Sequence, residues 1–195
     1  FDCYRLGFRT ITGATNERAL VVSILPKRVV TGNSLTVSVA IEDRAVNGEW
    51  HEYRLYSDAE LIAINSVMSS FVCDWFIRQK ILTNMNMFYV YQIPVPRLTA
   101  TDSRFIPIVA RAARLICTTP EFDDLAKAVG LSGSSDGATD PSERQRLRAE
   151  LDGLIAHLYG LTETEFAHIL GTFALVAEPV KTAALTAWRD VAAGK

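Results

Sequence analysis

The amino-acid sequence predicts an α+β fold in which a β-rich part, residues 1–98, precedes a helical part, residues 99–195. In the first part, short runs of β-branched and aromatic residues alternate with turn-forming residues, and one long amphipathic helix interrupts them. In the second part, apolar residues recur at helical spacing between clear capping signals. A chain of 195 residues that is 49% hydrophobic is also long enough to bury an apolar core.

Four segments of the first part favour strands by their composition or alternating polarity; they are residues 4–12, 18–25, 35–41 and 50–56. The turn-forming residues 13–16 separate the first two segments, which predicts a hairpin. Asn47-Gly48, a strong hairpin signal, comes shortly before the fourth segment. A fifth strand is expected at residues 88–93, where Pro94 stops it.

A single long helix is expected from a capping box at residues 57–60 to about Leu82. In this box the Ser57 hydroxyl and the Glu60 carboxylate bind each other's free backbone N–H groups. Behind the box, apolar residues recur at helical spacing: Leu61, Ile64, Met68, Phe71, Val72, Trp75 and Phe76. Asp74 lies among them and is expected to face solvent or to pair with Arg78 one turn later.

In the second part, Asp102 or Ser103 is expected to cap a helix that runs to about Cys117. Its apolar side is expected to comprise Phe105, Ile106, Val109, Ala113 and Ile116. A short helix follows near residues 121–129. Residues 130–141, rich in Gly and Ser, are expected to form a flexible loop that folding does not need.

Asp140, followed by Pro141, marks the start of another helix, whose apolar face comprises Leu147, Leu151, Leu154 and Leu158. Gly160 ends this helix, and residues 162–165 form a further capping box. A last helix is expected over residues 179–191.

Charge and composition exclude several classes of protein. The chain has 20 Lys and Arg against 22 Asp and Glu, so a nucleic-acid partner would have to be held by a local patch. No apolar run of about 18 residues and no signal peptide are found, so no membrane contact is expected. The odd number of widely spaced cysteines favours reduced, buried thiols in a cytoplasmic protein. The first residue is Phe1, which favours a fragment of a longer chain.

The sequence offers no catalytic residue and no metal site. A Gly-rich phosphate loop, a nucleophile elbow and an HExxH motif are all missing. The three histidines, His51, His157 and His168, lack zinc-ligand spacing and are expected to lie at the surface or to be satisfied within the fold. No cofactor is therefore expected in this chain.

Several cations and amides are candidates for holding a partner. Arg104, Arg111 and Arg114 share one helix face, which suits phosphates but is also typical of an ordinary solvated helix face. Arg78 and Lys80 end the long helix, where cations also complement the helix dipole. The loop candidates are Lys27, Arg28, Asn84 and Asn86, whose side-chain types read base edges but are common on any polar surface.

The order of several short motifs carries a resemblance. The motifs are Phe8-Arg9, residues 15–18, Ile24-Leu25-Pro26, and residues 61–66, 75–80, 86–88, 92–96, 150–161 and 169–173. Over about residues 4–173 the chain resembles the C-terminal target-recognition region of type IIG restriction enzymes that are also adenine methyltransferases. Phage-defence relatives of these enzymes, and the specificity subunits of type I restriction–modification systems, are related to the same region.

The resemblance implies that this chain recognises a sequence in double-stranded DNA while an upstream methyltransferase domain of the same bacterial, cytoplasmic protein binds S-adenosylmethionine. Residues 84–89 lack the prolines of the methyltransferase Asn-Pro-Pro-Tyr motif, and Leu125 stands where a nuclease pattern needs its second acid. The chain itself is therefore expected neither to methylate nor to cleave DNA. Four residues of a recurrent family landmark either contact DNA or brace the hairpin: Arg9, Thr15, Asn16 and Arg18.

An alternative hypothesis is a docking module that packs on the catalytic domains without reading bases. A small enzyme whose site has no recognisable motif is the least favoured hypothesis.

Overall fold

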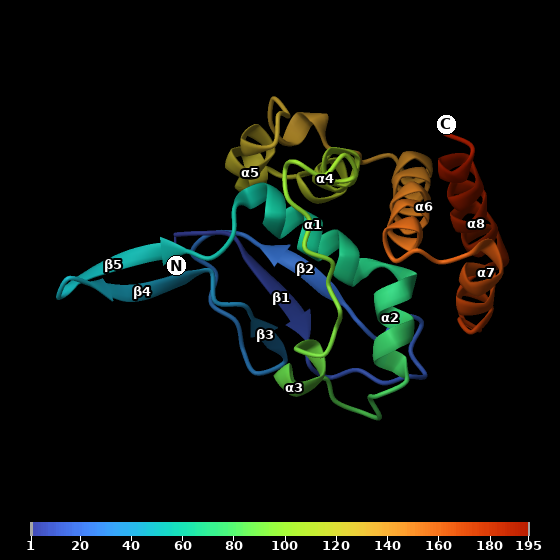
Figure 1. Ribbon diagram of the computed structural model, residues 1–195, viewed down its shortest axis with the longest axis horizontal. Helices are drawn as coiled ribbons and strands as arrows, with labels where there is room; N and C mark the ends of the chain where they lie inside the picture. Colours follow the sequence, from blue (N-terminus) through green and yellow to red (C-terminus); the bar gives the residue numbers. More distant parts are fainter. Residues whose placement is uncertain (1, 195) are drawn as a thin grey trace.

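A three-stranded antiparallel sheet forms the base of the β-rich part (Figure 1). The computed structural model describes residues 2–194 and confirms the α+β fold, with strands first and helices after them. Strand β1 (Arg5–Arg9) lies between β2 (Val22–Leu25) and β3 (Leu35–Val37). Gly7 of β1 pairs with Ser23 on one side and Val37 on the other, so the predicted hairpin is confirmed.

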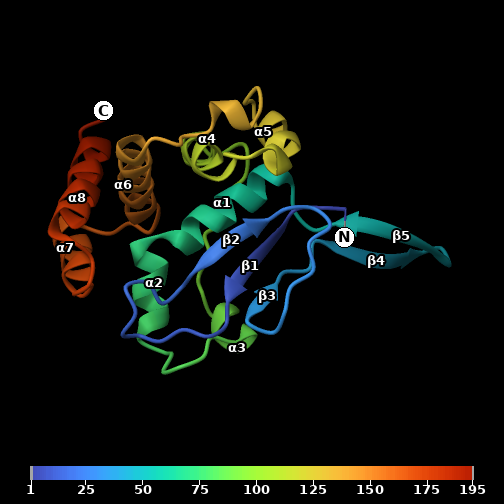
Figure 2. The same cartoon turned by 180° about the vertical axis from the view of Figure 1, so that it is seen from behind.

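A second hairpin projects from one end of the molecule, and helices α6–α8 lie at the opposite end (Figures 1 and 2). It comprises β4 (Ile41–Val46) and β5 (Glu49–Arg54), and every residue in both strands is exposed. The turn signal is confirmed, because Asn47 and Gly48 have φ values of +54° and +86°, as a type I′ turn requires. The strand expected at residues 35–41 is divided, because the chain leaves the sheet after Val37 and begins the hairpin at Ile41.

The long helix expected from Ser57 is two helices, α1 (Asp58–Ser69) and α2 (Phe71–Arg78), bent by 57°. The predicted capping box at Ser57 is present. The break has a local cause, because Ser70 is extended (φ −72°, ψ 159°) and its hydroxyl accepts the N–H of Cys73 at 3.3 Å. The buried Ser70 side chain thereby caps the start of α2.

The prediction of a strand at residues 88–93 is wrong. A short helix, α3 (Met87–Val90), occupies this segment. Asn86 is extended and its side chain accepts the N–H of Tyr89, so a local cap overrides the strand preference of aromatic residues.

The helical part contains α4 (Phe105–Ile116), α5 (Asp123–Ala128), α6 (Pro141–Leu158), α7 (Glu163–Gly171) and α8 (Glu178–Ala192). The caps predicted at Asp140 and Thr162 are confirmed, and both accept the N–H three residues later. Arg104 is the N-cap of α4 and makes no side-chain cap, although Asp102 accepts its N–H at 2.9 Å. Ile106 was expected on the buried side of α4 but is exposed, because Ile108 faces the core instead.

Residues 130–139 are anchored to the fold, which differs from the flexible loop expected there. A 3-10 turn (Ser134–Asp136) lies in this segment, and the N–H of Ser134 binds Asp123 at 2.7 Å. Ala138 is fully buried and donates its N–H to the Arg114 carbonyl at 2.7 Å. Gly137 lies so close to the backbone that a Cβ would be 2.2 Å from the Cys117 carbonyl oxygen. Small residues are required here for close packing rather than for flexibility.

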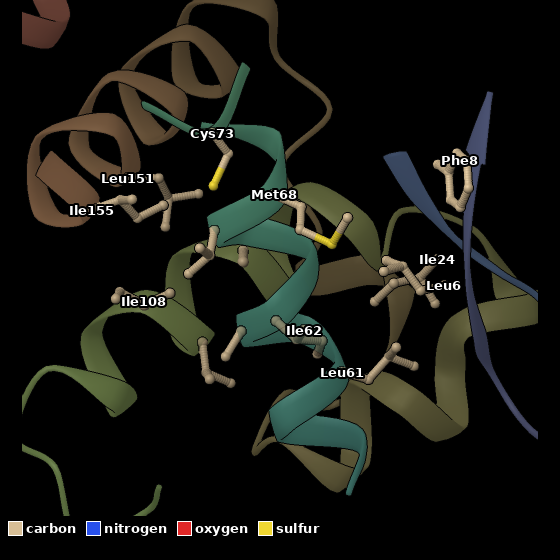
Figure 3. Close-up of a cluster of buried hydrophobic side chains, with 14 of the residues drawn as sticks. Leu6, Phe8, Ile24, Leu61, Ile62, Met68, Cys73, Ile108, Leu151 and Ile155 are labelled. Carbon is tan, nitrogen blue, oxygen red and sulfur yellow. The ribbon is translucent and has the colours of Figure 1, made fainter. Parts of the chain in front are cut away.

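Two apolar clusters stabilise the fold. In the first, α1 lies between strand residues such as Leu6 and Ile24 on one side and helix residues such as Ile108 and Leu151 on the other (Figure 3). The second joins α2 to α6, α7 and α8 and includes Phe71. The first cluster draws residues from both sides of the boundary expected at 98/99, so the two parts share one core.

The start of α2 depends on a residue far away in the sequence. Asp152 of α6 accepts the N–H of Phe71 at 2.9 Å. Removal of this carboxyl from water raises its pKa to about 6, although the charge of Arg18 opposes the shift.

The raised pKa of Asp152 predicts a pH-dependent stability. A carboxyl that holds its proton more tightly in the folded state stabilises the fold at low pH, and this contribution is lost as the pH rises from about 4 to about 6. As the pH rises over this range, we therefore expect the free energy of unfolding of Asp152→Asn to increase by up to about 3 kcal/mol relative to that of the parent chain. Urea unfolding of both proteins at pH 4, 5, 6 and 7 measures this difference in stability. A difference that stays constant with pH would contradict the prediction.

Within residues 2–194, no single helix is long and apolar enough to cross a membrane. The bent pair α1 and α2 meets the length and composition requirement only when taken together, and most of its apolar residues are buried in the core.

Candidate functional site

Arg18 and Arg78, two of the candidates for contact with DNA, are bound to a buried carboxylate. Asp74 is completely buried, with its oxygens 2.8 Å from Arg18 Nε and 2.9 Å from Arg78 Nε. It also accepts the backbone N–H of Ala19 at 3.1 Å. The expected pairing of Asp74 with Arg78 is confirmed, and the alternative that Asp74 faces solvent is wrong.

Arg78 also fixes the turn of the first hairpin. Its guanidinium donates to the carbonyls of Ala14, Asn16 and Glu17 at 2.9, 2.6 and 2.5 Å, and its charge lies 4.4 Å from the centre of the Phe173 ring. Together with the bond to Asp74, these contacts engage all three nitrogens of the guanidinium. Arg78 therefore positions a loop, and the landmark residue Arg18 likewise braces the hairpin.

The predicted arginine stripe on α4 is paired with carboxylates. Arg104 binds Asp102 at 2.6 Å, Arg111 binds Glu150 at 2.6 Å and Arg114 binds Glu143 at 2.7 Å. The last two pairs connect α4 to α6. The stripe is therefore largely neutralised and helps to fasten two helices together, a role that neither interpretation of its sequence pattern included.

Lys27 and Arg28 are also paired, at the end of the first hairpin that is remote from its turn. Lys27 binds Asp124 at 2.7 Å, and Arg28 binds Asp2 at 3.1 Å. Arg28 remains largely exposed and has a positive φ of 62°. Neither residue lies beside the other loop candidates.

Two segments at the end of β1 together form what we call the loop surface: residues 9–16 and residues 79–92. Backbone hydrogen bonds join them, from Met85 N–H to Thr10 O at 2.8 Å and from Thr12 N–H to Thr83 O at 3.3 Å. In Figure 1 this surface, which includes α3, lies below the sheet. It brings together six of the predicted candidates: Arg9, Thr15, Asn16, Lys80, Asn84 and Asn86.

The loop surface contains no carboxylate. Asp and Glu are missing from residues 9–16 and from the whole of residues 75–101, although Glu17 borders the surface. Arg9 is exposed and makes no ion pair within residues 2–194, and Lys80 contacts only the Gln92 amide oxygen at 3.1 Å and the Phe76 ring. A chain with net charge −2 thus presents one end where two cations lack acidic partners.

Sequence reasoning missed the exposed apolar side chains of this surface. Ile11, Leu82, Phe88 and Tyr91 have exposed fractions of 66%, 87%, 69% and 78%. Phe88 and Tyr91 were assigned to a strand, in which residues three apart face opposite sides. On a helix, residues three apart lie on one side. This helical spacing of Phe88 and Tyr91 was the sequence signal that could have predicted a shared exposed face.

Within residues 2–194, no three His, Cys, Asp or Glu side chains converge as a metal site requires. His157 stacks on the Trp188 ring with centroids 4.5 Å apart, and its Nε2 lies 2.8 Å from the Trp188 carbonyl oxygen. Cys73 and Cys117 are buried free thiols, and Cys3 is half-buried.

Comparison with known proteins does not identify this chain. No protein-family model matches it, and no curated protein or solved structure gives a significant match. The functional argument therefore depends on the residues themselves.

Proposed function

We propose that this chain recognises a target sequence in double-stranded DNA through its loop surface, as part of a restriction–modification adenine methyltransferase. The observation that carries this proposal is the carboxylate-free pairing of residues 9–16 with residues 79–92. Phosphates repel carboxylates and bind unpaired cations, so an interface with DNA needs such a surface even in a near-neutral chain.

The side chains of the loop surface suit different parts of a duplex. Arg9 and Lys80 suit phosphates, because neither forms an ion pair with an acidic group within residues 2–194. Asn84 and Asn86 are exposed amides of the type that pairs with adenine in the major groove. Phe88 and Tyr91 suit contacts to bases or sugars, where apolar side chains also act as wedges. Phosphate contacts would set the position, and the amides would supply specificity.

In this proposal the chemistry takes place elsewhere in the parent protein. S-adenosylmethionine would bind the upstream methyltransferase domain, which must take its target base out of the stack. The present chain would hold the duplex in register for that step.

Substituting the unpaired cations tests the proposal. We expect Arg9→Ala and Lys80→Ala each to weaken binding evenly across DNA sequences and to lower the salt slope by about one unit. Fluorescence anisotropy with a labelled duplex, measured over a series of salt concentrations, gives both quantities.

Arg104→Ala is the matched control, since it removes an arginine that is already paired with Asp102. Its binding should equal that of the parent chain. If Arg104→Ala weakens binding while Arg9→Ala and Lys80→Ala do not, the interface lies on α4 and the loop surface is the wrong assignment.

A second candidate function, docking on a protein domain, is favoured by the β4–β5 hairpin. Trp50 is 73% exposed there, and Asp43 lies directly opposite Glu52, an arrangement of like charges that destabilises a hairpin without a partner. An acidic arm with an exposed Trp suits a basic protein surface and repels DNA. In the anisotropy experiment, Trp50→Ala should leave DNA binding unchanged; weakened binding would place the hairpin on DNA.

A further inference from the structure

More than half of the exposed large apolar side chains gather on two separate surfaces. Of the fourteen such side chains among residues 2–194, four lie on the β4–β5 hairpin and four on the loop surface. The hairpin contributes Ile41, Val46, Trp50 and Tyr53, and the loop surface contributes Ile11, Leu82, Phe88 and Tyr91. Exposed apolar side chains that gather in this way mark interaction surfaces.

The hairpin also carries acids without partners. Both of its arginines are paired, Arg44 with Glu42 at 2.8 Å and Arg54 with Asp58. Within residues 2–194, three carboxylates of the hairpin therefore have no cation beside them: Asp43, Glu49 and Glu52. The hairpin is a negatively charged arm whose charge the rest of the described fold does not compensate.

One face of the hairpin combines two of these acids with the exposed tryptophan. The register places two pairs on this face, Asp43 opposite Glu52 and Ala45 opposite Trp50. Because opposite residues and alternate residues of two paired strands share a face, the four residues form one surface, which we call the arm face. The Arg44–Glu42 pair lies on the other face. The arm face thus offers an apolar ring beside two adjacent carboxylates.

The loop surface of the same chain offers the complement of the arm face. It contains no carboxylate, and Arg9 and Lys80 have no acidic partner within residues 2–194. Its exposed aromatic side chains, Phe88 and Tyr91, are favourable neighbours for a tryptophan ring. Complementary charge around apolar contacts is the composition of a specific protein interface.

The two complementary surfaces of one chain do not meet. The hairpin extends away from the body of the molecule, and α3 of the loop surface lies apart from it in both views (Figures 1 and 2). Contact between the two surfaces therefore needs two copies of the chain. Such a contact joins different surfaces of identical molecules, so each copy has one arm face to give and one loop surface to receive.

We propose that the arm face of one copy of this chain docks on the loop surface of a second copy. The two carboxylates of the arm face bind Arg9 and Lys80, and Trp50 packs on the exposed aromatic side chains. The inference rests on the docking function proposed for the hairpin and names its partner, but it does not require DNA binding. If the loop surface also binds DNA, carboxylates and phosphates compete for the same cations.

Sedimentation equilibrium from micromolar to millimolar concentration tests the proposal. We expect the mean mass to rise above that of one copy as the concentration rises, and this association to weaken with salt because it depends on charge. Of the three tryptophans, Trp50 is exposed and the other two are half-buried, so fluorescence emission should shift to shorter wavelength as Trp50 is covered. A mass of one copy at every concentration would overturn the proposal.

Charge reversal on either surface should prevent association. We expect Asp43→Lys and Lys80→Glu each to weaken it about tenfold or more, because like charges then meet. An equimolar mixture of the two variants should associate again, since it supplies one unaltered arm face and one unaltered loop surface. Glu42→Lys is the matched control, because it makes the same change of charge at the neighbouring residue on the other face of the hairpin. It should associate like the parent chain.

Three results would contradict the docking of the arm face on the loop surface. They are a mixture that stays monomeric, loss of association in Asp43→Lys but not in Lys80→Glu, and equal weakening by the Glu42→Lys control. The DNA proposal is tested separately. Association of a chain that does not bind a duplex contradicts the DNA proposal alone, whereas a chain that binds a duplex but never associates contradicts this one alone.

Discussion

The Asp74→Ala variant is expected to lose about 3–5 kcal/mol of its free energy of unfolding. Asp74 is completely buried and binds two guanidiniums, of which Arg78 is only 12% exposed. Without the carboxylate, both positive charges and the N–H of Ala19 lose their partner in a place that water hardly reaches. The cost is that of uncompensated buried groups, which greatly exceeds the net value of an exposed ion pair.

Urea denaturation of the parent chain and of Asp74→Ala measures this loss. Arg44→Ala is the matched control, because the Arg44–Glu42 pair has a similar length of 2.8 Å but lies on the exposed hairpin. We expect no measurable change for the control. A loss below about 1 kcal/mol for Asp74→Ala would mean that the cluster behaves as a solvated surface pair.

The helix starts could be predicted from the sequence because a cap depends on residues within one turn. Ser57, Asp140 and Thr162 each accept an N–H three residues later, and the sequence shows both members of each pair. The break at Ser70 could not be predicted in the same way. Its stability also depends on Asp152, which is 81 residues from Phe71 in the sequence.

The candidate site shows the same limit. Sequence patterns select Arg18, Arg78 and Arg111 as candidates for binding a partner. The charge of an arginine is available to a ligand, however, only if no carboxylate of the fold lies beside it. Arg111 pairs with Glu150, 39 residues away, whereas Arg9 and Lys80 have no acidic partner within residues 2–194. Long-range contacts of this kind decide which members of a basic set can bind a partner.

A glycine inside a helix also depends on a long-range contact. Gly153 lies in the middle of α6, where glycine normally weakens a helix, and the sequence gives no reason for it. The reason is the close approach of α8. A Cβ at position 153 would lie 2.7 Å from the Trp188 amide nitrogen and 2.8 Å from the carbonyl carbon of Ala187.

Gly153→Ala is therefore expected to destabilise the fold by about 2–3 kcal/mol, despite the higher helix propensity of alanine. The atoms that the new methyl group meets belong to backbone, so α8 as a whole must move away from α6. That movement also strains the contact between His157 Nε2 and the Trp188 carbonyl, now 2.8 Å long. Gly171→Ala in α7 is the matched control, because no atom lies within 4 Å of a Cβ there, and it should be neutral or stabilising by up to about 1 kcal/mol. Thermal unfolding of both variants tests the difference. Equal midpoints would show that α6 and α8 can separate without loss of packing, which would place most of the stability of the second apolar cluster in α2 and α7 instead.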